Sequence, residues 1–111
     1  MTSSEAEASF IARCEKDLQK KIAAWLSRNS LPFINPPMHR KSALPVGWPD
    51  FTFSIHGRAC AVEAKHDKNK PSKEQIEKRN ELIAAGWLVA TIFTYAEFLA
   101  FVKQAGWKDA I

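Results

Sequence analysis

Two acidic residues and one lysine in the middle of the chain have types and spacing that suit phosphodiester chemistry. The chain reads GWPDF at positions 47–51 and VEAK at positions 62–65. Residues two apart in a strand share a face, so Glu63 and Lys65 should project together. Asp50, at the mouth of the neighbouring strand, can join them once the two strands form a hairpin. Two carboxylates that converge beside a lysine suit a divalent metal bound through oxygen ligands.

The chemistry expected of this group is hydrolysis of a phosphodiester. Magnesium held by Asp50 and Glu63 would polarise the phosphate and activate a water molecule. Lys65 would orient or deprotonate that water, or stabilise charge in the transition state, and the sequence leaves these roles open. An isolated Glu-x-Lys in a strand is more often a charge pair on the surface. The Pro-Asp one hairpin upstream favours the catalytic interpretation.

The first half of the chain predicts one helix and three strands. Positions 4–29 predict the helix, and Pro32 prevents its continuation. Its apolar stripe comprises Ile11, Cys14, Leu18, Ile22, Trp25 and Leu26. Positions 31–34 predict a short strand, and positions 35–45, with three prolines and three basic side chains, predict an exposed loop. Alternating strands follow at positions 51–55 and 59–65, joined by a tight turn at positions 56–58.

The second half predicts a helix, a strand and a last helix. Ser72 and Gln75 fit a capping box that opens a helix running to about Ala85, which Gly86 ends. Positions 87–93 form a near-continuous apolar run, typical of a strand buried on both faces. Positions 94–97 repeat the capping-box pattern and open a helix that runs to about position 105.

These elements predict an α/β fold, a mixed sheet flanked by helices on both faces in the order αβββαβα. The helix between the last two strands is long enough for a crossover, so those strands should be parallel. A length of 111 residues fits one domain over positions 1–111.

Composition limits the class of protein. Hydrophobic residues make up 46% and charged residues 25%, and no apolar run approaches the ~20 residues of a membrane helix. The first seven residues carry two glutamates and no basic group, so we expect a cytoplasmic location without a secretory signal. Cys14 and Cys60 should be reduced, small, buried residues, and a structural zinc is not expected. The net charge of +4 and the pI of about 9.2 favour an anionic partner such as nucleic acid.

The pattern resembles the PD-(D/E)XK nuclease superfamily, and more closely its VRR-NUC branch. The resemblance spans about positions 10–103 and rests on short motifs whose order and spacing match. They are Glu15, GWPD at 47–50, EAK at 63–65, SKEQ at 72–75, Gly86 and the apolar strand at 87–93. The resemblance implies a restriction-endonuclease-like fold and Mg²⁺- or Mn²⁺-dependent cleavage of structured DNA. An origin in a phage or mobile element is an expectation from the same resemblance.

Two further residues acquire roles from this resemblance, and a third is weighed from its position in the helix. Gln75 matches an active-site glutamine of VRR-NUC-like proteins, although it also suits a capping residue. Glu15 matches an additional metal ligand or water-orienting group, the alternative being a solvated position at the edge of its apolar stripe. Arg79, one turn after Gln75, contacts the DNA backbone in one interpretation and is solvated in the other.

Basic residues gather in two loops that flank the expected centre. His39, Arg40 and Lys41 precede it, while Lys68, Lys70 and Lys73 follow it. Such groups would contact phosphates without reading bases, although each singly is more often only solubilising. The four tryptophans are expected in the core or at its rim. Trp48 is the exception worth testing because it lies beside Asp50.

Three functions compete on this sequence. The first is a structure-specific DNA endonuclease, such as a Holliday-junction resolvase or flap nuclease. A resolvase needs two symmetric cuts, which predicts a homodimer. The second is a non-catalytic DNA-binding module on the same fold, which would bind DNA and leave it intact. The third is a protein-interaction domain, which would show neither metal binding nor salt-dependent DNA affinity.

Overall fold

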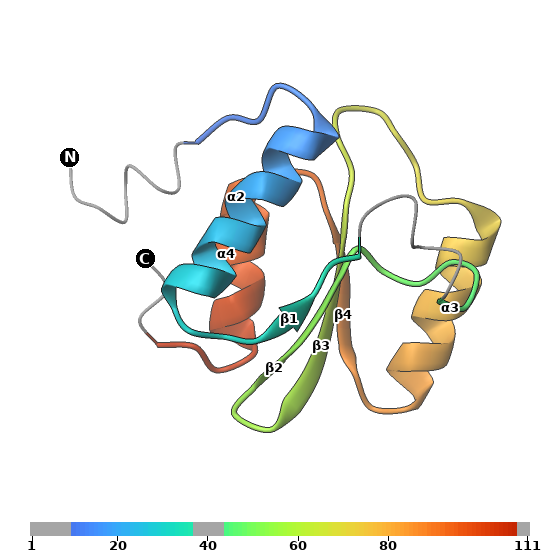
Figure 1. Ribbon diagram of the computed structural model, residues 1–111. Helices are drawn as coiled ribbons and strands as arrows, with labels where there is room; N and C mark the ends of the chain where they lie inside the picture. The colour runs from blue at the N-terminus through green and yellow to red at the C-terminus, as the bar shows by residue number, and fades with distance from the viewer. Residues whose placement is uncertain (1–9, 37–43, 109–111) are drawn as a thin grey trace.

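The computed structural model describes residues 10–36 and 44–108, drawn in colour in Figure 1. The elements follow one another in the predicted order αβββαβα. They are α2 (Glu15–Arg28), β1 (Phe33–Ile34), β2 (Phe51–Ile55), β3 (Arg58–Ala64), α3 (Lys73–Ala84), β4 (Leu88–Ile92) and α4 (Tyr95–Gln104). The predicted α/β class is therefore confirmed. Arg40 and Lys41, with His39, fall outside the described residues.

The strands form one mixed sheet in the order β1-β2-β3-β4. The β1–β2 and β2–β3 pairs are antiparallel, whereas β3 and β4 are parallel, as the crossover through α3 predicted. The β2–β3 hairpin turns through His56 and Gly57, both with positive φ, 49° and 83°. Positive φ at both loop residues is the type I′ geometry, which matches the twist of the flanking strands.

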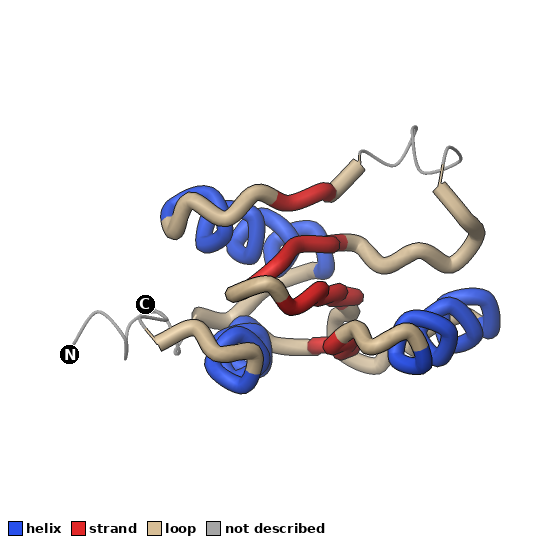
Figure 2. The backbone as a smooth tube through the Cα atoms, turned by 90° about the horizontal axis from the view of Figure 1, so that it is seen from below, coloured by secondary structure: helices blue, strands red, loops and turns tan. Residues whose placement is uncertain are grey.

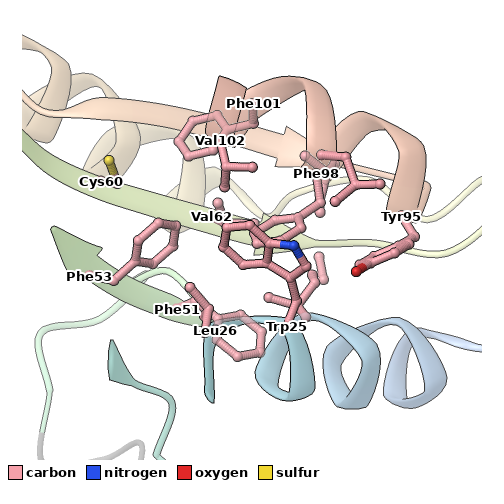
Figure 3. Packing of buried hydrophobic residues seen from close by; sticks show 14 of the residues in the cluster. Trp25, Leu26, Phe51, Phe53, Cys60, Val62, Tyr95, Phe98, Phe101 and Val102 are labelled. Atoms are coloured by element: carbon pink, nitrogen blue, oxygen red, sulfur yellow. The ribbon is translucent and has the colours of Figure 1, made fainter. Parts of the chain in front are cut away.

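The helices lie on both faces of the sheet. Helices α2 and α4 pack together on one face, and α3 covers the other beside β4 (Figures 1 and 2). The main core fills the space between the sheet and the α2–α4 pair (Figure 3). The indole ring of Trp25 lies at its centre and meets the rings of Phe98 and Trp107 edge-on. Burying aromatic rings in this way supplies much of the apolar stabilisation of a small domain.

The first helix begins later than the sequence predicted. Residues 10–13 are not helical, and α2 starts at Glu15 with Cys14 in extended conformation before it. Phe10 instead packs edge-on against Tyr95, and the carbonyl of Ala12 lies 3.1 Å from Nε2 of His66. These contacts hold the segment against α4 and the loop after β3, so tertiary packing overrides helix propensity. Ile11 is consequently 85% exposed instead of part of the stripe.

Two expectations about burial are wrong. Cys14 is exposed because it precedes the helix, whereas Cys60 is buried as expected. The strand β4 is not buried on both faces: its first four residues are only half-buried, and Phe93 beyond it is 36% exposed. The cause is strand order, because β4 is an edge strand with β3 as its single neighbour among the described strands. No helix in the described ranges is both long and apolar enough to span a membrane.

Candidate active site

Asp50 and Glu63 lie at the end of the β2–β3 hairpin that is remote from its turn. Val62 belongs to the main core, so Glu63 projects to the opposite face of the sheet, the one that α3 covers. Phe51 and Val62 form the last registered pair at this end, and Asp50 and Glu63 each adjoin one member of that pair. They are the buried acids of this sheet, 3% and 6% exposed, and Asp50 Oδ2 accepts a 3.0 Å hydrogen bond from the backbone N–H of Ala64.

Lys65 joins this pair at the end of β3. Its backbone N–H donates a 2.9 Å hydrogen bond to the carbonyl of Ile92, so pairing with β4 continues one residue beyond the strand. That pairing keeps Lys65 on the same face as Glu63, and its Nζ lies 3.9 Å from Glu63 Oε1. The Lys65 side chain is 14% exposed. An ammonium this well shielded from water interacts strongly with any anion that enters beside it.

Gln75 connects the first turn of α3 to the acidic pair. Its Oε1 accepts a 2.8 Å hydrogen bond from the backbone N–H of Ser72, while Ser72 Oγ accepts from the N–H of Gln75. The other end of the same amide donates from Nε2 to Glu63 Oε1 at 2.8 Å. The two interpretations of Gln75 are therefore compatible, because one planar amide performs the capping and contacts the site.

The backbone before Asp50 is pressed against α3. The N–H of Trp48 bonds to the carbonyl of Pro45 at 3.1 Å, which closes a turn with Gly47 at its third position. Gly47 has φ +82°, as a type II turn requires there. A Cβ added at Gly47 would lie 2.1 Å from the carbonyl oxygen of Glu74. Only a glycine permits this close approach of the loop to α3. The GWPD motif contains this glycine, but the sequence alone did not show why a glycine is needed there.

Glu15 occupies the first turn of α2 and is half-buried. Within residues 10–36 and 44–108, no group of three or more His, Cys, Asp or Glu side chains is arranged to hold a metal ion. Glu15 therefore does not complete a three-acid site with Asp50 and Glu63. Its part in metal binding stays a prediction.

Four of the basic residues expected to contact DNA are among the residues that the structure describes. Lys68 and Lys70 are exposed in the loop between β3 and α3, and Arg79 is exposed on α3. Lys73, also exposed, is 3.9 Å from Glu77 one turn along. Their contacts with DNA stay predictions.

The donor set fits a small divalent cation. Asp50 and Glu63 offer carboxylate oxygens, the ligands that Mg²⁺ and Mn²⁺ prefer. Mg²⁺ commonly binds one or two protein carboxylates and completes its shell with water and substrate phosphate. Two buried acids therefore suffice without a third protein ligand.

The fold places these residues in a known structural context. A solved structure described as a VRR_NUC domain protein superposes with a TM-score of 0.69, covering 86% of this chain and 89% of that one at 16% identity. The chain has a VRR-NUC fold. No family model and no curated protein matches the sequence. The VRR-NUC fold is thus recognised by comparison of structures. It confirms the fold that the motif resemblance predicted.

Proposed function

We propose that this protein is a metal-dependent DNA endonuclease that hydrolyses phosphodiester bonds. The observation that carries the proposal is a cluster at the end of β3: Asp50 and Glu63 are both buried, Asp50 accepts a hydrogen bond from the N–H of Ala64, and Lys65 lies 3.9 Å from Glu63. Burying two acids costs free energy, and a cation between them compensates that cost. The VRR-NUC fold of the structural neighbour supports a nuclease, and the net charge of +4 supports a polyanionic substrate.

In this proposal some residues bind the cation and others position the ligands or stabilise negative charge. Asp50 and Glu63 would hold Mg²⁺ or Mn²⁺, which when bound polarises the phosphate and lowers the pKa of water. Gln75 fixes the orientation of the Glu63 carboxylate through its Nε2 bond. Lys65 stabilises the negative charge that accumulates on the phosphate oxygens. A water oxygen forms a bond to phosphorus, the bond from phosphorus to one sugar oxygen breaks, and that oxygen leaves with a proton.

The proposed substrates are branched or flapped DNA, including the four-way Holliday junction. Exposed Lys68, Lys70 and Lys73 follow β3 and flank the site, where they would contact phosphates of a bent or branched backbone. Resolution of a four-way junction requires two symmetric cuts. The proposal therefore includes a homodimer with two-fold symmetry for that substrate.

A cleavage assay tests this proposal. Linear duplex, flap and four-way DNA are incubated with Mg²⁺, Mn²⁺ or EDTA, for the wild type and for Asp50→Asn, Glu63→Gln and Lys65→Ala. We expect cleavage that needs the metal, and a loss of at least about 100-fold in rate for each variant. Lys103→Ala, which removes an exposed lysine from the last turn of α4, is the matched control and should keep full activity.

Binding measurements separate the proposal from its alternative. The carboxamide variants should lose Mn²⁺ affinity in calorimetric titrations while they still retard DNA in gels. A wild-type protein that retards DNA and leaves it intact in every metal would instead be a non-catalytic binding module. Full activity in Asp50→Asn or Lys65→Ala would contradict the assignment of the site.

A further inference from the structure

A cavity of about 360 Å³ lies beside Gln75, the residue whose side chain bonds to Glu63. Residues 44–48 form one wall, and Ser72 and Gln75 at the start of α3 form the other. Gln75 belongs to both places, because its amide lines the cavity and also donates to Glu63 at 2.8 Å. Trp48 precedes Asp50 by two residues. A group bound in the cavity would therefore lie next to a phosphate at the acidic pair.

The lining of this cavity is apolar and aromatic on one side and neutral polar on the other. Its described residues include no carboxylate, ammonium or guanidinium group. The Trp48 ring is partly exposed and packs edge-to-face on Trp87, with centroids 6.0 Å apart and an interplanar angle of 85°. Ser72 and Gln75 line the opposite side, where their side chains are held by the capping box and by the bond to Glu63. This lining suits a flat, uncharged heteroaromatic ring.

The wall is formed in advance of binding. The turn from Pro45 to Trp48 is closed by its own hydrogen bond. Gly47 packs against the backbone of Glu74 too closely for any side chain. The loop therefore cannot move away from α3 without loss of this packing, and a preformed wall lowers the entropic cost of binding.

We propose that this cavity takes the base of one unpaired nucleotide adjacent to the scissile phosphate. The assignment deepens the proposed endonuclease function and rests on it. The volume lies near the lower end of the range of ~300–1,000 Å³ for small-molecule sites, so it admits one nucleoside and excludes a base-paired stack. A base must leave the helix to enter, which costs least where it is already unpaired. The cavity thereby selects flaps and junctions over linear duplex.

The test measures whether the protein senses the base in the absence of cleavage. Fluorescence anisotropy in Ca²⁺ gives the Kd for flap DNA, with an abasic analogue placed in turn at each of the first three unpaired positions. We expect one position at which loss of the base weakens binding about 5- to 100-fold, as for loss of one stacked base. In Trp48→Ala the affinities for intact and abasic DNA should become equal.

A second variant, Val46→Trp, keeps the test valid if Trp48→Ala fails to fold. Val46 is 75% exposed at the mouth of the cavity, so Val46→Trp should fold normally and fill the space. It should weaken binding of intact flap DNA and leave binding of the abasic analogue unchanged. Ile83→Trp adds the same bulk at a 47% exposed apolar position on α3 and is the matched control, with no effect expected on either DNA.

The outcomes distinguish this inference from the proposed function. Equal losses on intact and abasic DNA in both cavity variants would overturn the assignment of a base to the cavity. Cleavage by the wild type together with that result would leave the nuclease proposal standing. A base-dependent affinity with no cleavage in any metal would support binding of a base in the cavity, and would overturn both the nuclease proposal and the adjacency of that base to a scissile phosphate.

Discussion

Gln75 Nε2 donates a 2.8 Å hydrogen bond to Glu63 Oε1, so the first turn of α3 is joined directly to β3. The same side chain closes the capping box with Ser72 at its other end. The orientation of the amide is therefore fixed by the helix before any substrate arrives. Preorganisation of this kind keeps a carboxylate in position without further loss of side-chain entropy.

Gln75→Glu should separate the two tasks of this side chain. A glutamate can still accept from the N–H of Ser72, so the capping box should persist. It places a second carboxylate against Glu63, which opposes ionisation of the pair and raises its pKa. We expect the acid limb of the pH–rate profile to move to higher pH and the rate at neutral pH to fall about 10-fold or more. Cleavage rates across pH with thermal melts provide the measurement.

The second capping box of the chain supplies the control for this prediction. Glu97 accepts from the N–H of Thr94 and its own N–H donates to Thr94 Oγ1, as Gln75 does with Ser72. Glu97→Ala and Gln75→Ala should each destabilise the protein by roughly 1 kcal/mol. Only Gln75→Ala should also lower activity. Equal activity in the two alanine variants would show that Gln75 acts through stability alone.

Gly47→Ala should disturb the site through the backbone. Alanine at φ +82° is strained, and its Cβ would lie 2.1 Å from the Glu74 carbonyl oxygen, so the loop must move away from α3. Asp50, three residues on, would move with it. Gly57→Ala shares the conformational cost at φ +83° but meets nothing within 4 Å. We expect both variants to lose about 1 kcal/mol or more in denaturant titrations. Gly47→Ala alone should lose most of its activity.

The arrangement of the candidate site was largely predictable because it depends on local rules. Strand alternation placed Glu63 beside Lys65, and the glycine of a two-residue turn fixed the register that pairs Phe51 with Val62 and brings Asp50 to the end of β3. The capping box of α3 is equally local, since Ser72 and Gln75 are three residues apart. Gln75 can reach Glu63 because the loop after β3 carries the start of α3 to the sheet face on which Glu63 projects.

The errors arose where long-range contacts decide the structure. The start of α2 depends on Tyr95 and His66, which are remote from the helix in sequence. The half-burial of β4 depends on its place at the sheet edge, which periodicity does not encode. The cavity combines a turn and a helix start about 25 residues apart, so neither segment alone indicates it.

Asp17 should make the stability of α2 depend on pH. A hydrogen bond from the backbone N–H of Arg13 lowers the pKa of this carboxyl, and the Arg13 side chain adds to the effect. A lowered folded-state pKa contributes stability above the unfolded value of about 3.9, which is lost as the pH falls through the folded pKa. Wild type should therefore be more stable than Asp17→Asn at pH 7, and the difference should vanish near pH 2. Denaturant titrations across this range measure it.

Arg13→Ala tests which contact with Asp17 matters. The backbone N–H remains in this variant, while the exposed guanidinium, whose ion pair contributes little in water, is lost. The stability difference caused by Asp17→Asn should persist in the Arg13→Ala background. Its disappearance there would assign the effect to the side chain of Arg13 instead.

The two cysteines should react with a thiol reagent in separate phases, because one lies before α2 and the other in the core. Cys14 is exposed, so one thiol per chain should be modified rapidly in the native protein. Burial makes Cys60 inaccessible and raises the pKa of its thiol, so little reactive thiolate is present at neutral pH. Its modification should require unfolding and should accelerate with denaturant. Cys14→Ser should abolish the rapid phase and leave the slow one, whereas a helix that began near position 4 would bury Cys14, and the wild type would then show no rapid phase.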